Sequence, residues 1–477
     1  MNVMPEKIAR TGRVQNWLDN PESRLPVSCT VFEVQDSMEG PDGIEASWLF
    51  TSYALRYGAG VAIHLSKIRP ENTGNGRGLI SSGPISFAEE YHLKNKILRR
   101  GGIWKNGAVV LHMDLDHPDV LQLIDAPRTW CPWAKRCINL NQNMWDDASP
   151  DLQESLISAI ARGDVWLAKI RYDQHGQRIF ANVCLEVFLR SRGTCLLEHI
   201  ALGACDVNEI GDVFEAGMKE LIELHAKTGV GESREYLPPD QDRQVGLGML
   251  GLANLLALED VKYAEFADAL DSITKGKEFK SLSPRALSIG YALKDGIARA
   301  AKVAKEANMD RAFAIAPTAS CSYRYTDRKG FTTTPEIAPP INRVVDRDSG
   351  TFGVQQVNYG NVETCDEVGW DNYVRVANGI MQMLQDTGLS HGYSFNTWSD
   401  HVCYNNEFIQ DWLDSPQTSM YYSLQVRRNT QAKDDAMVAL GDEAGDFSIF
   451  GFDDIDADDN DSAIDWIQNQ GCVGCAE

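Results

Sequence analysis

Residues 180–189 read FANVCLEVFL and place an amide, a thiol and a carboxyl side chain at alternate positions: Asn182, Cys184 and Glu186. In an extended segment, alternate side chains point to the same side, so we expect these three groups to lie together. A thiol between an amide and a carboxylate can serve as a redox or radical centre with its own base. The alternative is a strand-edge cysteine with polar neighbours, because so short a pattern arises easily by chance.

Helical and strand patterns alternate on both sides of this segment. Helices are predicted over 149–163 and 283–307, where apolar side chains recur on one face. Strands are predicted at 27–35, 109–115 and 312–316, which are short, apolar and followed by turn or polar residues. Strands that alternate with helices favour an α/β fold with mainly parallel strands.

A literal G-x-G-x-x-G stands at Gly246, Gly248 and Gly251. A dinucleotide-binding fingerprint needs a strand immediately before it, whereas the polar stretch PPDQDR precedes this one. We interpret the glycines instead as small residues of a closely packed helix.

The charge is unevenly distributed along the 477 residues, of which 45 are Lys or Arg and 68 are Asp or Glu, a net charge of −23. Thirteen of the acids follow Lys433 and no base does, which leaves 55 acids against 45 bases, or −10, in the rest of the chain. An acidic chain is unsuited to general nucleic-acid binding, although local donors can still hold a nucleotide. The segment after Lys433 has the composition of a flexible tail.

No run of apolar residues is long enough to span a membrane, and the first residues lack the apolar core of a signal peptide. We therefore expect a cytoplasmic protein without a membrane span. The chain has 11 cysteines, and without a secretory signal they are better interpreted as thiols than as a disulfide scaffold.

Further motifs occur in a fixed order around residues 180–189. They are PVSCTVFEVQDSMEG (26–40), RYGAGVAIHLSKIRP (56–70), RRGGIWKNGAVVLHMDLDHPDV (99–120), GTCLLEHIALGACD (193–206), RQVGLGMLGLAN (243–254), APTASCS (316–322), QTSMYYSLQ (417–425) and the terminal GCVGCAE (471–477). Together they resemble the catalytic (large, alpha) subunit of ribonucleotide reductase, from about residue 26 to the end. The resemblance implies a ten-stranded α/β barrel over 26–430 with a catalytic finger loop inside it. A short segment, 1–25, precedes the barrel, and the flexible acidic tail covers 431–477.

The resemblance also assigns roles to the site residues. Cys184 would carry a thiyl radical that removes the hydrogen atom from C3′ of the ribose. Glu186 would be the base for the 3′-hydroxyl, and Asn182 would hold the substrate by a hydrogen bond. Cys29 and Cys195 would supply two reducing equivalents and end each cycle as a disulfide.

The terminal Cys472-x-x-Cys475 pair would act as a mobile reductant. It would exchange with the active-site disulfide and be reduced again by thioredoxin or glutaredoxin. Half of a zinc site is the alternative, but zinc takes four ligands and the chain offers no second CxxC.

By the same resemblance, the substrate would be a ribonucleotide at the diphosphate level. The proposed substrate-binding residues are rich in hydroxyl groups and backbone N–H donors suited to phosphate: Ser28, Pro317, Thr318, Ala319, Ser320, Cys321 and Ser322. Cys321 departs from the family pattern, as does Val183, where many relatives have proline.

The radical source divides the family. Tyr421 and Tyr422 resemble the tyrosine pair that receives a radical from a separate, ferritin-like, metal-containing small (beta) subunit. We therefore expect a class I-like enzyme that binds no metal or cofactor of its own. An adenosylcobalamin-dependent enzyme is the alternative within the family, and a non-catalytic redox or regulatory protein is the alternative outside it.

Regulation is expected at one site only. Just 28 residues precede Cys29, so the ATP cone that many relatives carry is predicted to be missing. Asp36 and Ser37 match residues that recognise the base of a dNTP or ATP effector, and Arg69 and Arg77 match residues that meet its triphosphate. Residues 101–109 resemble the loop that links effector and substrate. In relatives this site lies at a subunit interface, so a homodimer is implied.

Overall fold

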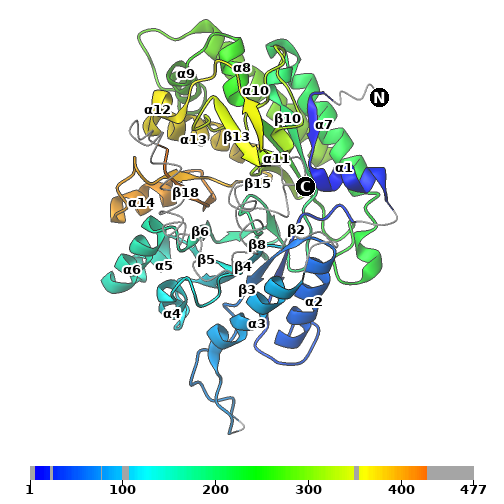
Figure 1. Cartoon of the computed structure of the whole chain (residues 1–477), viewed down its shortest axis with the longest axis vertical. Helices are drawn as coiled ribbons and strands as arrows, with labels where there is room; N and C mark the ends of the chain where they lie inside the picture. Colours follow the sequence, from blue (N-terminus) through cyan, green and yellow to red (C-terminus); the bar gives the residue numbers. More distant parts are fainter. Residues whose placement is uncertain (1–5, 22–24, 77, 99–106, 349–353, 427–477) are drawn as a thin grey trace.

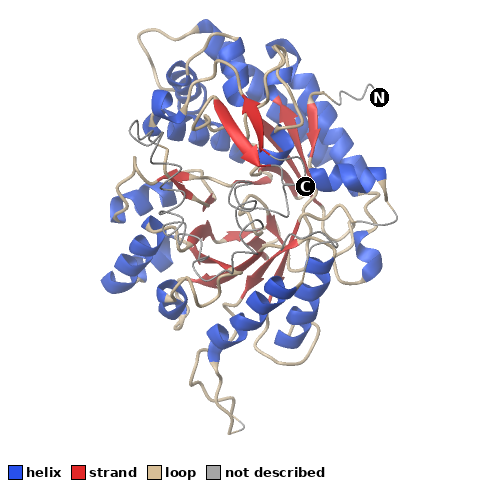
Figure 2. Cartoon of the chain, viewed as in Figure 1, coloured by secondary structure: helices blue, strands red, loops and turns tan. Residues whose placement is uncertain are grey.

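The computed structural model describes residues 6–21, 25–76, 78–98, 107–348 and 354–426. Figures 1 and 2 show its main strands in two sheets that face each other, with most helices on their outer sides. One sheet has six strands in the order β17-β6-β5-β4-β3-β2: β2 (Cys29–Glu33), β3 (Gly60–His64), β4 (Val109–Asp114), β5 (Lys135–Leu140), β6 (Trp166–Lys169) and β17 (Ser419–Met420). The other has five in the order β1-β10-β11-β12-β15: β1 (Ile8–Arg10), β10 (Leu197–Ala201), β11 (Gln244–Leu250), β12 (Arg311–Ile315) and β15 (Ser390–Tyr393).

Most neighbouring strands in the two sheets run parallel. The exceptions are the edge strands β17, antiparallel to β6, and β1, antiparallel to β10. Residues 8–10 therefore belong to the five-stranded sheet, although the sequence places them before the barrel. Three smaller groups complete the strands: β7 (Arg171–Tyr172), β8 (Arg178–Ala181) and β9 (Phe188–Leu189); β13 (Val344–Asp348) and β14 (Val354–Asn358); β16 (Thr397–Trp398) and β18 (Ser423–Leu424).

The helices follow the strands along the chain, as an α/β fold requires. Their bounds are α1 (Gly12–Asp19), α2 (Ile44–Arg56), α3 (Gly83–Ile97), α4 (Val120–Asp125), α5 (Gln142–Asp147), α6 (Pro150–Ala161), α7 (Ile210–His225), α8 (Leu252–Leu258), α9 (Tyr263–Lys275), α10 (Pro284–Glu306), α11 (Ala319–Ser322), α12 (Cys365–Val368), α13 (Trp370–Asp386) and α14 (Asn406–Asp414). Within the described ranges, none of these helices is long and apolar enough to cross a membrane.

The expected α/β class is confirmed. The described strands do not form a closed barrel, and the expected number of ten barrel strands is not confirmed. The described strands form two separate ladders rather than one continuous ring. Between β2 and the segment before β10 there is only an isolated antiparallel bridge, Thr30 to Thr194. The physical reason is the chain direction: the approach to β10 meets β2 antiparallel and pairs with it over too short a length to continue either ladder.

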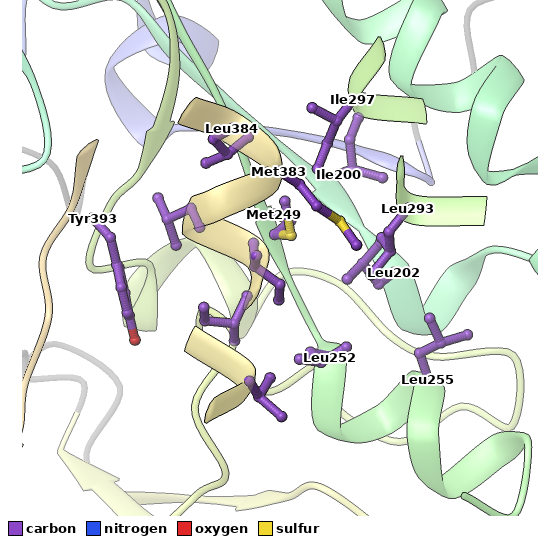
Figure 3. Close-up of a cluster of buried hydrophobic side chains, with 14 of the residues drawn as sticks. Ile200, Leu202, Met249, Leu252, Leu255, Leu293, Ile297, Met383, Leu384 and Tyr393 are labelled. Atoms are coloured by element: carbon purple, nitrogen blue, oxygen red, sulfur yellow. The ribbon is translucent and has the colours of Figure 1, made fainter. Parts of the chain in front are cut away.

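Each sheet is covered on its outer face by helices and shares its inner face with the other sheet. Outside the five-stranded sheet, side chains of β10 and β11 such as Ile200 and Met249 pack with Leu293 and Ile297 of α10 and with Leu384 of α13 (Figure 3). A second apolar core joins β2–β6 to α2, α3 and α6. A third cluster fills the space between the sheets and contains side chains from both.

The predicted helices and three strands match observed elements closely. The helix predicted over 149–163 is α6, whose N-cap Ser149 accepts a hydrogen bond from the backbone N–H of Leu152 at 3.3 Å. The helix predicted over 283–307 is α10. The strands predicted at 27–35, 109–115 and 312–316 contain or nearly coincide with β2, β4 and β12.

The helical interpretation of the G-x-G-x-x-G stretch is wrong. Gly246 and Gly248 lie in the strand β11, which is buried along its whole length. A Cβ atom at Gly246 would lie 2.3 Å from Leu197 Cδ2, and one at Gly248 would lie 2.2 Å from the carbonyl oxygen of Ala314. A strand buried on both faces shows no alternation of apolar and polar residues, which is why the pattern resembled a packed helix.

Replacement of Gly248 by alanine should destabilise the fold, because the new methyl group meets a backbone oxygen that cannot move independently of the sheet. We expect Gly248→Ala to lower the free energy of unfolding by about 1–3 kcal/mol, the usual cost of overpacking a core, measured by urea denaturation. Gly74→Ala is the matched control, because a Cβ there meets nothing within 4 Å. A loss in the control equal to that in Gly248→Ala would contradict the packing explanation.

Candidate active site

The segment that carries Asn182, Cys184 and Glu186 is a turn between β8 and β9 that lies between the two sheets. It is not extended, so the expectation that alternation places the three side chains on one side of a strand is wrong. The turn closes by a hydrogen bond from the backbone N–H of Asn182 to the carbonyl of Val187, at 2.9 Å. Leu185 adopts a left-handed φ of 64°.

The turn itself brings the amide and the carboxylate together. Asn182 Nδ2 donates to Glu186 Oε1 at 3.0 Å, and Asn182 Oδ1 accepts from the backbone N–H of Val187 at 3.2 Å. Asn182, Cys184 and Glu186 are all fully buried. The turn thus fixes a carboxyl group and an amide in contact with each other, near the buried Cys184 in the sequence.

The five-stranded sheet holds the turn from one side. Ser394, which follows β15, donates its hydroxyl to the carbonyl oxygen of Cys184 at 2.5 Å and lies 3.4 Å from Glu186 Oε2. Gly392 lies so close that a Cβ atom there would be 2.2 Å from the carbonyl oxygen of Glu186. The chain around residues 392–394 therefore fixes the backbone position of the cysteine.

The six-stranded sheet holds β8, the strand that leads into the turn. Asp114, at the end of β4, accepts two hydrogen bonds from Arg178, with N–O distances of 2.5 and 2.6 Å. Asn139 Nδ2 also donates to Asp114, at 3.0 Å. His64 Nε2 lies 3.1 Å from the carbonyl of Ala181, and burial lowers the pKa of this histidine well below its ordinary value. Sequence analysis missed this support, because nothing local connects these residues.

Cys29 and Cys195 are neighbours, although 166 residues separate them. The backbone N–H of Cys29 donates to Cys195 Sγ at 3.0 Å, and the backbone N–H of Cys195 donates to the carbonyl of Cys29 at 3.2 Å. Both thiols are buried, and both belong to the inter-sheet cluster that contains Cys184. The geometry thus brings the backbones of the two cysteines into contact, with the sulfur of Cys195 against the N–H of Cys29. A reversible dithiol–disulfide pair requires such proximity.

Tyr421 and Tyr422 are buried in the same inter-sheet cluster. Their ring centroids lie 4.4 Å apart at an interplanar angle of 65°. Trp166 of β6 packs against both, with centroid separations of 4.5 Å to Tyr421 and 5.0 Å to Tyr422. Burial raises the pKa of Tyr422 well above its ordinary value, against a hydrogen bond from Tyr421 that lowers it. Sequence analysis identified the tyrosine pair and missed the tryptophan.

The residues proposed to bind substrate phosphate form the turn into the short helix α11. Thr318 and Ser322 are buried, and their hydroxyls already make internal contacts. Thr318 Oγ1 accepts from the backbone N–H of Glu336 at 2.9 Å, and Ser322 Oγ donates to the carbonyl of Ala319 at 2.8 Å. Because Thr318 Oγ1 accepts in this hydrogen bond, its hydroxyl proton can still be donated to a phosphate, together with the backbone N–H groups of the turn. Ser28 and Pro317 are also buried, and the side chain of Ser320 lies outside the described part.

Cys321 points away from the inter-sheet cluster. Its sulfur lies 3.4 Å from the carbonyl oxygen of Arg10 in β1, and it packs with Ala201 and Leu250. Burial raises the pKa of this thiol to about 11, so it stays protonated at neutral pH.

The residues proposed to bind an effector are only partly described. Arg69 and Asp36 form an ion pair, with Arg69 Nε 2.7 Å from Asp36 Oδ2, and both side chains are about one-third exposed. Ser37 follows directly, and its backbone N–H donates to the carbonyl of Gln35 at 2.8 Å. Arg77, most of the loop 101–109 and the tail with Cys472 and Cys475 lie outside the described residues. Over the ranges that are described, no group of three or more His, Cys, Asp or Glu side chains is arranged to hold a metal ion.

Residues 27–147 match the family model described as ribonucleotide reductase, barrel domain. Vitamin B12-dependent ribonucleotide reductases are similar over part of the chain. The protein from Bradyrhizobium diazoefficiens is 29% identical over 118 residues, and that from Agrobacterium fabrum is 28% identical over 115; each match covers 24% of this chain and 9% of the relative. The chain thus matches about a tenth of the length of these relatives.

Among solved structures, the Actinobacillus ureae class Id ribonucleotide reductase alpha subunit is similar with a TM-score of 0.60. It is 16% identical, and the match covers 89% of this chain and 88% of that one. The sequence matches and this shared fold confirm the resemblance to ribonucleotide reductase catalytic subunits.

The ion pair of Asp114 and Arg178 should matter for stability, because it anchors the strand that enters the turn. We expect Asp114→Asn to lower the free energy of unfolding by about 1–3 kcal/mol, since it leaves a partly buried guanidinium without its charge partner. Urea denaturation measures the change. Glu223→Gln, which breaks the exposed pair with Lys227, is the matched control and should cost less than about 0.5 kcal/mol. Equal losses would argue against an anchoring role.

Proposed function

We propose that this chain, a relative of the ribonucleotide reductase catalytic subunits, reduces ribonucleotides to deoxyribonucleotides. The observation that carries the proposal is the convergence of Cys184, Cys29 and Cys195 in one buried cluster between the two sheets. Cys184 stands on a rigid turn beside a carboxyl group and an amide. It is disulfide-bonded in the structure, so it must be reduced before it can carry a radical. Cys29 and Cys195 contact each other. This is the set of groups that the reaction needs: a radical carrier, a base and a two-electron reductant.

The chemistry assigns each group one step. A thiyl radical on Cys184 takes the hydrogen atom from C3′, and Glu186 takes the proton of the 3′-hydroxyl. The 2′-hydroxyl then leaves as water. Cys29 and Cys195 supply two electrons and two protons and become a disulfide, and the C3′ hydrogen returns from Cys184. The sum is one ribonucleotide and one dithiol giving one deoxyribonucleotide, one disulfide and one water.

Burial of the cluster supports radical chemistry. Cys184, Glu186 and Asn182 have no exposed surface, and a closed site protects a reactive intermediate from water and from side reactions. The dithiol is equally buried, so its disulfide would need an internal reductant. We propose that Cys472 and Cys475 fill that role and pass the oxidising equivalents to thioredoxin or glutaredoxin.

Two sources of the Cys184 radical are each supported by different observations. The buried Tyr421 and Tyr422, whose rings contact each other edge-on, support transfer from a metal-containing partner subunit, and the fold shared with a class Id alpha subunit supports the same source. The vitamin B12-dependent relatives support adenosylcobalamin instead. We favour the partner subunit, because the tyrosines lie in the same cluster as Cys184.

Activity assays separate these sources. The purified chain is incubated with cytidine or guanosine diphosphate, or with the triphosphates, in the presence of a class I small subunit or of adenosylcobalamin. We expect deoxynucleotide product with the small subunit and the diphosphates. Tyr422→Phe should lower that turnover at least 1,000-fold, because phenylalanine cannot be oxidised in the relay. Turnover with adenosylcobalamin that is unaffected in Tyr422→Phe would contradict the relay.

Cys184→Ser should abolish product formation with every activator, since a serine hydroxyl does not form the required radical. Product is quantified by chromatography after a fixed time. Cys403→Ser, at an exposed cysteine, is the matched control and should retain wild-type turnover. Residual multiple turnover in Cys184→Ser would contradict the proposed chemistry.

A further inference from the structure

A short stretch of buried chain contacts both the cysteine turn and the tyrosine pair. The chain leaves β15 at Tyr393 and enters β16 at Thr397, and we call residues 394–397 the linking segment. The side chains of all four residues are buried. In the proposed chemistry, the linking segment carries no reacting group.

The first residue of the linking segment holds the cysteine turn. Ser394 Oγ lies 2.5 Å from the carbonyl oxygen of Cys184 and 3.4 Å from Glu186 Oε2. A hydroxyl group has one proton to donate, and the shorter distance directs it to the carbonyl of Cys184. The backbone N–H of Ser394 donates to the carbonyl of Ile315 in β12 at 3.1 Å. Ser394 thus joins the backbone of the cysteine to the five-stranded sheet.

The other three residues of the linking segment hold the tyrosine pair by its backbone. The carbonyl of Phe395 accepts from the backbone N–H of Tyr421 at 2.8 Å. Asn396 Oδ1 accepts from the backbone N–H of Tyr422 at 3.2 Å. The backbone N–H of Thr397 donates to the carbonyl of Tyr422 at 2.8 Å. Only the contact of Asn396 is made by a side chain, so a substitution can remove it.

The contacts with the cysteine and with the tyrosines lie close together. Ser394 and Asn396 are two residues apart, so their Cα atoms lie within about 7 Å of each other. Cys184 and both tyrosines belong to the same inter-sheet cluster. A displacement of the linking segment would therefore change the spacing between the tyrosine rings and the Cys184 thiol.

We propose that Ser394 and Asn396 are positioning residues that fix the spacing between the tyrosine pair and Cys184 for transfer of the radical. The inference rests on the proposed function, in which the metal-containing small subunit supplies the oxidant as a radical on the tyrosine pair. In this step a tyrosyl radical takes the hydrogen atom of the reduced Cys184 thiol. The S–H bond breaks, the O–H bond of the tyrosine forms, and the unpaired electron remains on the sulfur. Because such a transfer requires near contact, a displacement of about 1 Å can slow it about 100-fold.

Asn396→Leu tests the proposal at the tyrosine end of the linking segment. Leucine has a similar size but no acceptor for the backbone N–H of Tyr422, so we expect turnover with the small subunit to fall about 100-fold. Asn396→Asp retains an acceptor oxygen and should retain most of the wild-type turnover. The matched control is Gln385→Leu, at an exposed position of α13, which should leave turnover unchanged. Wild-type turnover in Asn396→Leu would overturn the proposal.

Isotope effects distinguish slow radical transfer from a general loss of structure. In Asn396→Leu, D₂O should slow turnover more than it does in the wild-type chain, because the thiol hydrogen that is transferred exchanges with solvent. Deuterium at C3′ of the substrate should slow turnover no more than in the wild-type chain. A variant that merely contains fewer active molecules would show both isotope effects unchanged, and that result would overturn the proposal.

Ser394→Ala tests the cysteine end and removes only a hydroxyl group, so the proposal does not depend on the folding of one variant. It should show the same pattern of isotope effects as Asn396→Leu. A larger effect of deuterium at C3′ would instead assign Ser394 to the base Glu186 and would overturn its positioning role.

Hydrogen exchange gives a readout without turnover. Mass spectrometry should show faster exchange of the Tyr422 backbone N–H in Asn396→Leu than in the wild-type chain, and no change in Gln385→Leu. Unchanged exchange in Asn396→Leu would overturn the proposal even in an active chain. A wild-type chain that reduces no ribonucleotide but shows the expected exchange would instead reject the proposed function, and with it the role in radical transfer, while confirming the contact between the linking segment and the tyrosine pair.

Discussion

The cysteine turn can occupy the space between the two sheets only because the strands beside it carry glycines. A Cβ atom at Gly392 of β15 would lie 2.2 Å from the backbone oxygen of Glu186, and one at Gly60 of β3 would lie 3.0 Å from a methyl group of Val183. Each sheet thus touches the turn through a residue without a side chain. The contact between Asn182 and Glu186 depends on this fit, since it exists only while the turn keeps its shape. Functional groups held on such rigid surroundings keep their geometry through a reaction.

Burial also determines which ionisable side chains in the interior are charged. Water is excluded, so an ionised group needs a partner, and Asp114 has one in Arg178. Among the described residues, Glu198 in β10 has an ion pair only with Arg10, at 3.9 Å, and burial raises the pKa of this glutamate well above its ordinary value. Burial likewise lowers the pKa of His199 to about 3, so this histidine is neutral. Burial thus favours the uncharged forms of Glu198 and His199, whereas Asp114 has a charge partner.

The sequence predicted the features that depend on one segment of the chain, and it did not predict contacts between segments that are far apart. Helices α6 and α10 were predictable because their caps and apolar faces lie within one segment. The α/β class followed from the alternation of strands and helices. The course of the turn at 182–187 did not follow from alternation, because a hydrogen bond to Val187 and the packing of Gly392 override it. Likewise β11 looked helical, since burial on both faces removes the period that marks a strand.

Contacts between residues that are far apart in the chain leave no pattern in a single sequence. The order of the motifs identified Cys29 and Cys195 as candidate site residues. They are in contact because the segment before β10 lies antiparallel to β2. Trp166 lies in no motif, and its place in the site depends on its contacts with Tyr421 and Tyr422, which are far away in the sequence. The same consideration limits what the relatives say about the radical source. The family match at residues 27–147 includes β2–β5 and ends before the cysteine turn, Cys195 and the tyrosine pair. Residues 27–147 form one side of the site. Both kinds of ribonucleotide reductase can share this side, so it does not distinguish the two radical sources. The distinction must lie in the part of the chain outside the family match.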